Sequence, residues 1–243
     1  MAVRHRTSPM YNERGDFFMS VQRKSIDKVK RMTAIAMFCA LAFVCTAMIK
    51  VPVMFLTLDV KDFLIILCAL LFGPLAGLAV AIAVPFLEFF TISDTMVYGL
   101  VMNLLSSVTF SMVTGLIYHY KKSLTGAIVG LVSGVFAVTA VMMLANLLVT
   151  PYFMGATVEY VASIIPTVLL PFNLTKAMLN AALVLLFYKP LSNVLKRVGF
   201  LPKSAREQEG KASKKSIMRS VLISTVALLV IAGSLSIILF VLK

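Results

Sequence analysis

Lys176 lies in a stretch of almost wholly apolar residues, and the segment around it is long enough to cross a bilayer. A lysine at the centre of a membrane helix costs about 2.5–3.5 kcal/mol on insertion scales. Asn173 and Asn180 lie three residues before it and four after it, which places the three side chains in one stripe of a helix. Polar side chains in a membrane face a bundle interior or a cavity, and they mark functional sites by default. The stripe therefore predicts a polar pocket, with snorkelling of the lysine to the outer surface as the alternative.

Polar side chains of four other segments fall at the same depth as Lys176 when each predicted helix rises about 1.5 Å per residue. They are Asp59, Glu88, Asn103 and Asn146. Segments that are distant along the chain therefore bring amides and carboxylates to one level, on the external side. We expect Asp59, Glu88 or an anionic group of a ligand to pair with Lys176.

Aromatic residues are predicted at this level too: Phe55, Phe86, Phe89, Phe90, Tyr98, Tyr152, Phe153, Tyr160 and Phe172. Tyrosine at a membrane interface is ordinary. In a pocket that also holds amides, however, the set suits a planar heteroaromatic ligand, because rings stack on its faces and amides bind its edge.

The composition indicates which elements position these residues. The chain has 243 residues, of which 60% are hydrophobic and only 14% are charged. That is too apolar for a soluble domain of this length, so we predict an all-α integral membrane bundle. Seven apolar runs are expected to form its helices, at residues 32–49, 63–72, 74–92, 97–118, 124–149, 164–188 and 221–242. The second run is short and predicts a buried or tilted span or a re-entrant segment.

The basic residues predict the orientation of the bundle. Of 23 Lys and Arg, eight precede the first run, two lie between the fourth and fifth runs, and nine lie between residues 189 and 219. The loops at 91–95 and 151–160 contain no Lys or Arg. The positive-inside rule therefore places the N-terminus in the cytoplasm, and seven crossings then put every basic loop inside. The net charge of +13 is interpreted as this orientation signal and not as a nucleic-acid site.

Four segments are expected along the chain. Residues 1–31 form a basic cytoplasmic N-terminal segment, which is too polar for a cleaved signal peptide. Residues 32–201 form a six-helix membrane bundle that binds the substrate. Residues 202–219 are polar and charged, which is typical of a flexible cytoplasmic linker, and residues 220–243 form an additional membrane helix.

Small residues recur at four-residue spacing in three of the runs, and Gly73 and Gly77 form the pattern at the start of the third. Gly126, Gly130 and Gly134 predict close packing of the fifth run against another helix of the bundle. Ala36 and Ala40 form a similar pattern in the first run, where docking onto a second membrane protein is the functional interpretation.

Motifs of several enzyme classes are absent from the sequence. It contains no G-x-x-x-x-G-K-[ST] loop for ATP, no G-x-S-x-G nucleophile elbow, and only two histidines. Its three cysteines fall in apolar runs without metal-ligand spacing, so we expect neither a metal site nor a disulfide framework. We therefore predict a binding protein and not an enzyme, without a cofactor or an energy source of its own.

Three stretches together resemble the substrate-binding (S) components of energy-coupling factor (ECF) vitamin transporters, and the riboflavin branch in particular. They are FLTLDVKDFLIILCALLFGPLAGLAVAI, GAIVGLVSG and PFNLTKAMLNAALVLLFYKPL, within residues 32–192. The FGPLAG turn and the PFN-x-x-K segment are the most specific parts. The resemblance implies a six-helix bundle that binds the vitamin near the outer surface. It also implies a transmembrane coupling (T) component and two ATPase subunits as partners, so the lack of a P-loop is expected.

The resemblance implies roles for particular residues as well. Asn173 and Lys176 match the amide and the lysine of the PFN-x-x-K segment, and Asn146 matches an amide of the fifth helix. The loop at 50–58 is expected to cover the ligand in part. The residues expected to bind the substrate are Phe55, Thr57, Leu58, Asp59, Glu88, Asn103, Asn146, Asn173, Lys176 and Asn180, and those expected to dock the coupling protein are Ala36 and Ala40.

The leading prediction is thus a multi-pass protein of the cell membrane that captures riboflavin, or a related flavin, for ATP-driven uptake by partner subunits. An S component for another small aromatic vitamin or precursor, such as hydroxymethylpyrimidine or pyridoxine, is the alternative within the class. An intramembrane enzyme and a structural or assembly protein are alternatives from other classes. The function of the additional C-terminal helix is left open.

Overall fold

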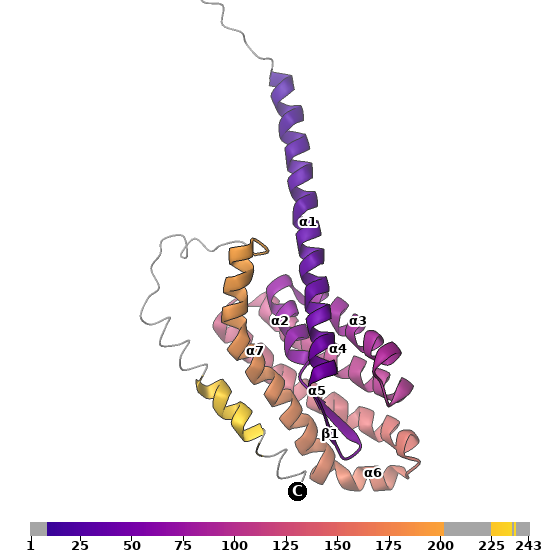
Figure 1. Ribbon diagram of the computed structural model, residues 1–243. Helices are drawn as coiled ribbons and strands as arrows, with labels where there is room; N and C mark the ends of the chain where they lie inside the picture. Colours follow the sequence, from indigo (N-terminus) through magenta and orange to yellow (C-terminus); the bar gives the residue numbers. More distant parts are fainter. Residues whose placement is uncertain (1–8, 202–224, 235, 237–243) are drawn as a thin grey trace, which may run out of the picture.

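The computed structural model of the protein describes residues 9–201, 225–234 and 236 (Figure 1). The elements are, in order, α1 (Pro9–Met48), β1 (Lys50–Val53), β2 (Leu56–Asp59), α2 (Asp62–Phe72), α3 (Pro74–Thr91), α4 (Met96–Tyr120), α5 (Leu124–Met154), α6 (Val158–Ile164), the π-helical turn η1 (Ile165–Leu169) and α7 (Leu170–Val198). A further apolar helix covers Thr225–Ser234. The linker predicted at 202–219 and the rest of the last predicted span lie outside the described residues.

Among the described residues, five helical segments are long and apolar enough to cross a membrane: Lys28–Met48, Pro74–Thr91, Met96–Tyr120, Leu124–Met154 and Val158–Val198. They coincide with five of the seven runs that the sequence predicts. The prediction of a helical membrane bundle is therefore confirmed.

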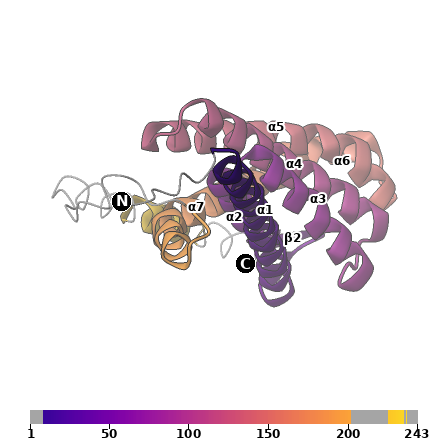
Figure 2. The same ribbon diagram turned by 90° about the horizontal axis from the view of Figure 1, so that it is seen from above.

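The short second run forms α2, which is the central helix of the bundle. It has 11 residues and is therefore about 16 Å long, half of what the hydrocarbon core of a bilayer requires. Every residue from Asp62 to Leu70 is buried. Helices α1, α3, α4 and α7 surround it, and Figure 2 shows α4 lying between α3 and α5. The sequence predicts a buried or tilted span or a re-entrant segment for this run, and the structure shows a buried helix.

Helices α4 and α5 pack closely because glycines of α5 face α4. A Cβ atom at Gly130 would lie 2.9 Å from the carbonyl oxygen of Thr114, and one at Gly134 would lie 2.8 Å from the ring of Phe110. The hydroxyl of Thr114 donates a hydrogen bond to the carbonyl oxygen of Gly130 at 3.2 Å. The small-residue stripe of this run therefore serves packing within the bundle, as predicted.

The segment after α1, expected only as a loop, is a two-stranded antiparallel hairpin. Its register pairs Lys50 with Asp59 and Val53 with Leu56, which leaves a two-residue turn. Met54 in this turn has φ = 54°, a left-handed conformation that costs a non-glycine residue about 1–3 kcal/mol. The β1–β2 hairpin lies at the end of the bundle opposite the N-terminus of α1 (Figure 1).

The π turn η1 joins α6 to α7 next to this hairpin end. Pro166 within it has no N–H group, so the regular i→i−4 bond cannot form there. Such π turns inside helices are frequent at functional sites. Here the turn sets the rotation of α7 just before Asn173 and Lys176.

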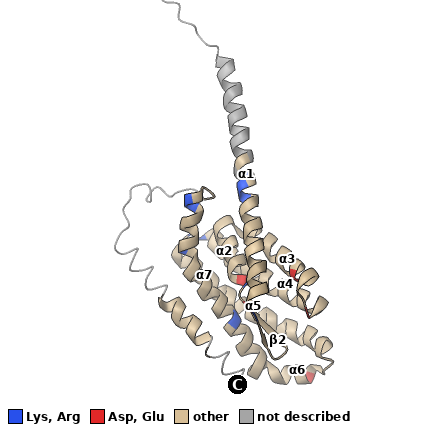
Figure 3. Cartoon of the chain, viewed as in Figure 1, with Lys and Arg blue, Asp and Glu red and all other residues tan. Residues whose placement is uncertain are grey.

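Helix α1 begins at Pro9, well before the apolar run, so part of the predicted N-terminal segment is helical and extends from the bundle (Figure 1). Figure 3 shows Lys and Arg at the end of the bundle where α1 leaves it and α7 ends. There, Arg31 donates a hydrogen bond to the carbonyl oxygen of Phe72 at 2.7 Å, which binds the end of α2 to α1.

Candidate ligand-binding cavity

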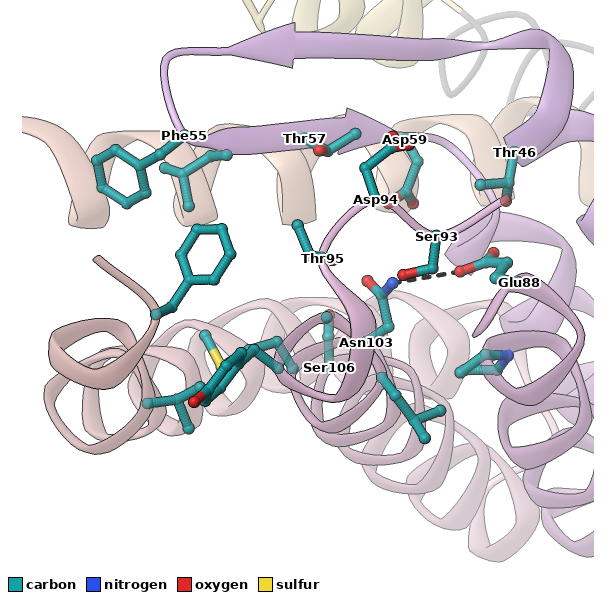
Figure 4. A pocket seen from close by; sticks show the side chains of 18 of the residues that line it. Thr46, Phe55, Thr57, Asp59, Glu88, Ser93, Asp94, Thr95, Asn103 and Ser106 are labelled. Atoms are coloured by element: carbon teal, nitrogen blue, oxygen red, sulfur yellow. Dashed lines mark hydrogen bonds between the residues drawn. The ribbon is translucent and has the colours of Figure 1, made fainter. Parts of the chain in front are cut away.

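A cavity of about 170 Å³ opens between the β1–β2 hairpin and the nearby ends of α1, α3, α4, α5 and α7. Figure 4 shows the hairpin along one side of it and helical side chains along the other. Charged, amide, hydroxyl and aromatic groups line it together. The charged ones are Lys50, Asp59, Lys61, Glu88, Asp94 and Lys176.

Lys176 reaches from α7 to the end of the hairpin. Its Nζ lies 2.8 Å from Oδ2 of Asp59, and the Lys176 side chain is 13% exposed. Burial raises the pKa of Asp59, but the charges of Lys176 and Lys61 outweigh it and hold this pKa below its usual range. The pair therefore fixes the last residue of β2 against α7. The predicted pairing of Lys176 with Asp59 is observed.

A second ion pair closes the inner wall. Lys61, which is 1% exposed, places its Nζ 2.5 Å from Oε2 of Glu88 and 3.8 Å from Oδ2 of Asp59. The amide of Asn103 donates to the same Oε2 of Glu88 at 3.2 Å (Figure 4). Oδ1 of Asp59 and Oε1 of Glu88 are buried without a hydrogen-bond partner in the part of the chain that the structure describes.

A third pair lies at the mouth of the cavity. Lys50 at the start of β1 places its Nζ 2.5 Å from Oδ2 of Asp94 and 3.2 Å from the carbonyl oxygen of Ile92. The hydrogen bond and the charge of Lys50 hold the pKa of Asp94 below its usual range. The base of the hairpin is thereby bound to the α3–α4 loop.

Two buried amides face the cavity from α5 and α7. Nδ2 of Asn146 donates to the carbonyl oxygen of Met142 at 2.7 Å, and Nδ2 of Asn173 donates to that of Leu169 at 2.8 Å. Oδ1 of Asn146 also accepts from the hydroxyl of Thr150 at 2.8 Å. Because an amide nitrogen carries two hydrogens, each has a second donor for a ligand.

Aromatic rings line the cavity as well: Phe55, Phe89, Tyr98, Phe153 and Phe172. Tyr98 and Phe153 pack edge to face, with ring centroids 5.9 Å apart. Figure 4 shows Phe55 away from Glu88 and Thr46. The cavity thus combines aromatic rings with charged and amide groups.

Eight of the ten residues predicted to bind the substrate line this one cavity: Phe55, Thr57, Asp59, Glu88, Asn103, Asn146, Asn173 and Lys176. They come from the hairpin, α3, α4, α5 and α7. The convergence that the sequence predicts for its polar residues is therefore present in the fold.

Leu58 and Asn180 do not line the cavity. Side chains alternate along a strand, so Leu58 points away from the face that carries Thr57 and joins the hydrophobic core. Asn180 is 0% exposed, and its Oδ1 accepts from the backbone N–H of Phe63 at 2.9 Å. Its Nδ2 donates to the carbonyl oxygen of Lys176 at 3.0 Å. Asn180 therefore binds the start of α2 to α7, which is a structural role.

Several lining residues, Lys61 among them, were missed by the sequence prediction. The others include Thr46, Lys50, Asp94, Ser106 and Thr150. A signal for Lys61 was its place between Asp59 and Asp62 at the start of an apolar run. Beneath the cavity, Asp62 accepts a hydrogen bond from the hydroxyl of Ser107 at 2.5 Å. The described residues hold no cluster of three His, Cys, Asp or Glu that could bind a metal ion.

Comparisons with known proteins were made for sequence and for fold. Residues 30–188 match the family model described as "ECF transporter, substrate-specific component". The chain is 33% identical over 192 residues to the riboflavin transporter RibU of Staphylococcus aureus (strain TCH60), an alignment that covers 74% of this chain and 100% of that protein. It also matches a solved structure of the S component of a bacterial ECF transporter with a TM-score of 0.60 and 33% identity, over 70% of this chain and 99% of that one.

Proposed function

This chain belongs to the family of substrate-specific (S) components of ECF transporters, and from that premise we propose that it captures riboflavin from outside the cell for uptake. The family consists of multi-pass membrane transporters and is not an enzyme family. What the cavity binds is therefore a cargo that leaves it chemically unchanged.

The observation that supports riboflavin is that aromatic rings, amides and hydroxyl groups line the same cavity. Riboflavin has a flat three-ring system whose edge carries an N–H and carbonyl groups, and a tail of hydroxyl groups. Rings such as Tyr98 and Phe153 offer stacking surfaces, and the amides of Asn146 and Asn173 offer donors. The likeness to the staphylococcal riboflavin transporter supports the same substrate.

The orientation in the membrane belongs to the proposal. We infer that the hairpin end with its cavity faces outward and that the N-terminus lies in the cytoplasm. Lys and Arg at the opposite end of the bundle support this orientation (Figure 3).

Import also requires partners, since the sequence contains no ATP-binding loop of the P-loop type. We propose that a transmembrane coupling (T) component and two ATPase subunits supply the energy. Ala36 and Ala40 are exposed on α1, whereas Ala34 and Phe38 are buried in the bundle. A face of small exposed residues supports docking of another membrane protein there.

Titration of the purified protein with riboflavin tests the proposal. Binding should quench riboflavin fluorescence at a stoichiometry of about one, because a stacked and buried flavin is strongly quenched. Protein expressed in riboflavin-containing medium should purify yellow. Pyridoxine and hydroxymethylpyrimidine are the competitors, and they should not displace the flavin. Displacement by either of them, or no quenching with folded protein, contradicts riboflavin as the substrate.

A further inference from the structure

Three consecutive residues at the start of α2, residues 61–63, each bind a different helix beneath the cavity. The first pairs with Glu88 of α3, and the carboxyl of the second lies 2.5 Å from the hydroxyl of Ser107 of α4. The third donates its backbone N–H to Asn180 of α7. Helices α3, α4 and α7 all line the cavity. The start of α2 therefore sets the positions of three walls of the cavity relative to one another.

The ionisable side chains buried around this point do not balance in charge. Two are lysines and three are carboxylic acids: Lys61, Lys176, Asp59, Asp62 and Glu88. If all five were ionised, the cluster would carry one negative charge without a positive partner inside the bundle. An unpaired buried ion is so unfavourable that such a group normally becomes neutral by gaining or losing a proton. One of the three acids is therefore expected to keep its proton.

The contacts distinguish Asp62 from the other two acids. Oδ2 of Asp59 lies 2.8 Å from Nζ of Lys176, and Oε2 of Glu88 lies 2.5 Å from Nζ of Lys61. No ion pair among the described residues includes Asp62, which is 2% exposed and whose side-chain neighbours are serine hydroxyls. A hydroxyl both donates and accepts, so it can serve a neutral acid as well as a carboxylate.

The other groups around α2 do not supply the missing positive charge. Lys176 also borders a void of about 10 Å³ that Asp62 lines, but its ammonium is already paired. Helix α1 contributes Arg31, which binds the far end of α2. It also carries two partly buried thiols, Cys39 and Cys45. The N-terminus of α2 favours a carboxylate, but this effect is smaller than the penalty for an unpaired buried ion.

We propose that Asp62 is a proton-binding site: it holds a proton at neutral pH and, as the neutral acid, keeps the start of α2 bound to α4 beneath the cavity. The proton lies on Oδ2, which is 3.4 Å from the hydroxyl of Ser106, while Oδ1 accepts from the hydroxyl of Ser107. The cluster then contains two ion pairs and one neutral acid. Asp62 does not line the cavity, so it is a positioning residue, and its effect on ligand binding rests on the proposed function.

Infrared spectroscopy of the purified protein at neutral pH tests the inference without any ligand. A protonated carboxylic acid has a C=O stretching band that is separate from the bands of carboxylates and amides. The unmodified protein should show this band, and Asp62→Asn should lack it. Glu159→Gln is the matched control and should keep the band, because Glu159 is exposed on α6.

Glu88→Gln tests the charge balance itself. Two lysines then face two acids, so Asp62 should release its proton and the band at neutral pH should weaken or disappear. Asp59→Asn changes the balance in the same way, and it serves as the test if Glu88→Gln fails to fold. A side chain that is neutral through burial alone would keep its band in both variants.

Two substitutions of Asp62 show whether the neutral acid positions the cavity. Asparagine is an uncharged analogue of the neutral acid, so Asp62→Asn should keep the melting temperature and the riboflavin affinity of the unmodified protein. Asp62→Ala removes the partner of two serine hydroxyls. It should weaken riboflavin binding about fivefold or more, measured by fluorescence titration at a temperature where the variant is folded.

The outcomes that overturn the inference are distinct from failure of the proposed function. No protonated-acid band in the unmodified protein, or an unchanged band in Asp62→Asn, refutes the proton site. An unchanged band in both Glu88→Gln and Asp59→Asn refutes the charge balance on which it rests. Unmodified riboflavin affinity in Asp62→Ala refutes the positioning role. If the unmodified protein binds no riboflavin, the proposed function is wrong, whereas the infrared result stands or falls without it.

Discussion

At the scale of single residues, the asparagines of the bundle divide into two groups. Asn146 forms its hydrogen bonds within α5, Asn173 donates to Leu169 of the adjoining turn η1, and both line the cavity. Asn180 instead connects α7 to the start of α2 and does not line it. The first pair is therefore suited to bind a ligand, whereas Asn180 stabilises the fold.

Alanine substitution should separate these roles. Asn146→Ala and Asn173→Ala should each weaken riboflavin binding about 5- to 100-fold, because each removes a donor from a desolvated site where an unmade hydrogen bond costs about 1–3 kcal/mol. Their melting temperatures in detergent should change little. Asn180→Ala is the matched comparison and should lower the melting temperature, since the N–H of Phe63 loses its partner. Equal affinities in all three variants, measured by titration at a temperature where each is folded, contradict this division.

The polar stripe of α7 could be predicted from the sequence, but the partners of the charges could not. Helical spacing places Asn173, Lys176 and Asn180 on one face, and depth in the membrane places them near Glu88. Lys61, however, pairs with a residue 27 positions away, and this pairing depends on how α2 is seated against α3. Spacing along one helix also could not show that Asn180 lies beyond the cavity floor.

At the scale of elements, the β1–β2 hairpin determines access to the cavity. The Lys50–Asp94 pair holds its base to the α3–α4 loop at the mouth. The side chain of Asp94 is 85% exposed, so the pair contributes modestly and is screened by salt. Its effect is expected in the rate of ligand release.

Asp94→Asn should speed riboflavin dissociation about two- to fivefold at neutral pH and low salt, measured by stopped-flow fluorescence. The paired Asp94 has a lowered pKa, so the pair is intact above the ordinary carboxyl pKa and is lost as the pH falls through the lowered one. The difference in rate between the unmodified protein and Asp94→Asn should therefore persist down to about pH 4, the ordinary carboxyl pKa, and disappear only as the pH falls further. Lys50→Met should reproduce the faster release. If Asp94→Asn releases riboflavin at the unmodified rate at neutral pH, the Lys50–Asp94 pair does not control ligand release.

The helices were easier to predict than the hairpin. Apolar runs of membrane length are unambiguous in the sequence, and the glycine spacing of α5 correctly predicted close packing. Strands of four residues are too short for a clear alternating pattern, and Pro52 lies within the first. The buried position of α2 also depends on the four helices around it, which the sequence does not specify directly.

At the scale of the whole molecule, the exposed faces of the bundle determine which partner proteins can dock on it. Helix α1 buries Ala34, Phe38 and Ala42 and leaves Ala36 and Ala40 exposed. Ala36→Leu and Ala40→Leu should abolish riboflavin uptake in cells that contain the coupling subunits, because larger side chains prevent close helix approach. Riboflavin binding by the purified variants should be unchanged.

Met37→Leu, another change at an exposed position of α1, is the control for these variants and should transport normally. Full riboflavin uptake in both Ala36→Leu and Ala40→Leu would exclude this face of α1 as the docking surface. Lost binding in the purified variants would show instead that the substitutions disturb the bundle.

The central claim is that the hairpin and five helices converge on one cavity that holds the flavin. An experimental structure of the protein saturated with riboflavin tests it most directly. We expect density for the ring system beside Tyr98 and Phe153, and hydrogen bonds donated by the amides of Asn146 and Asn173 to the flavin. Flavin density at any other place on the protein, or an empty cavity at saturating riboflavin, would contradict it.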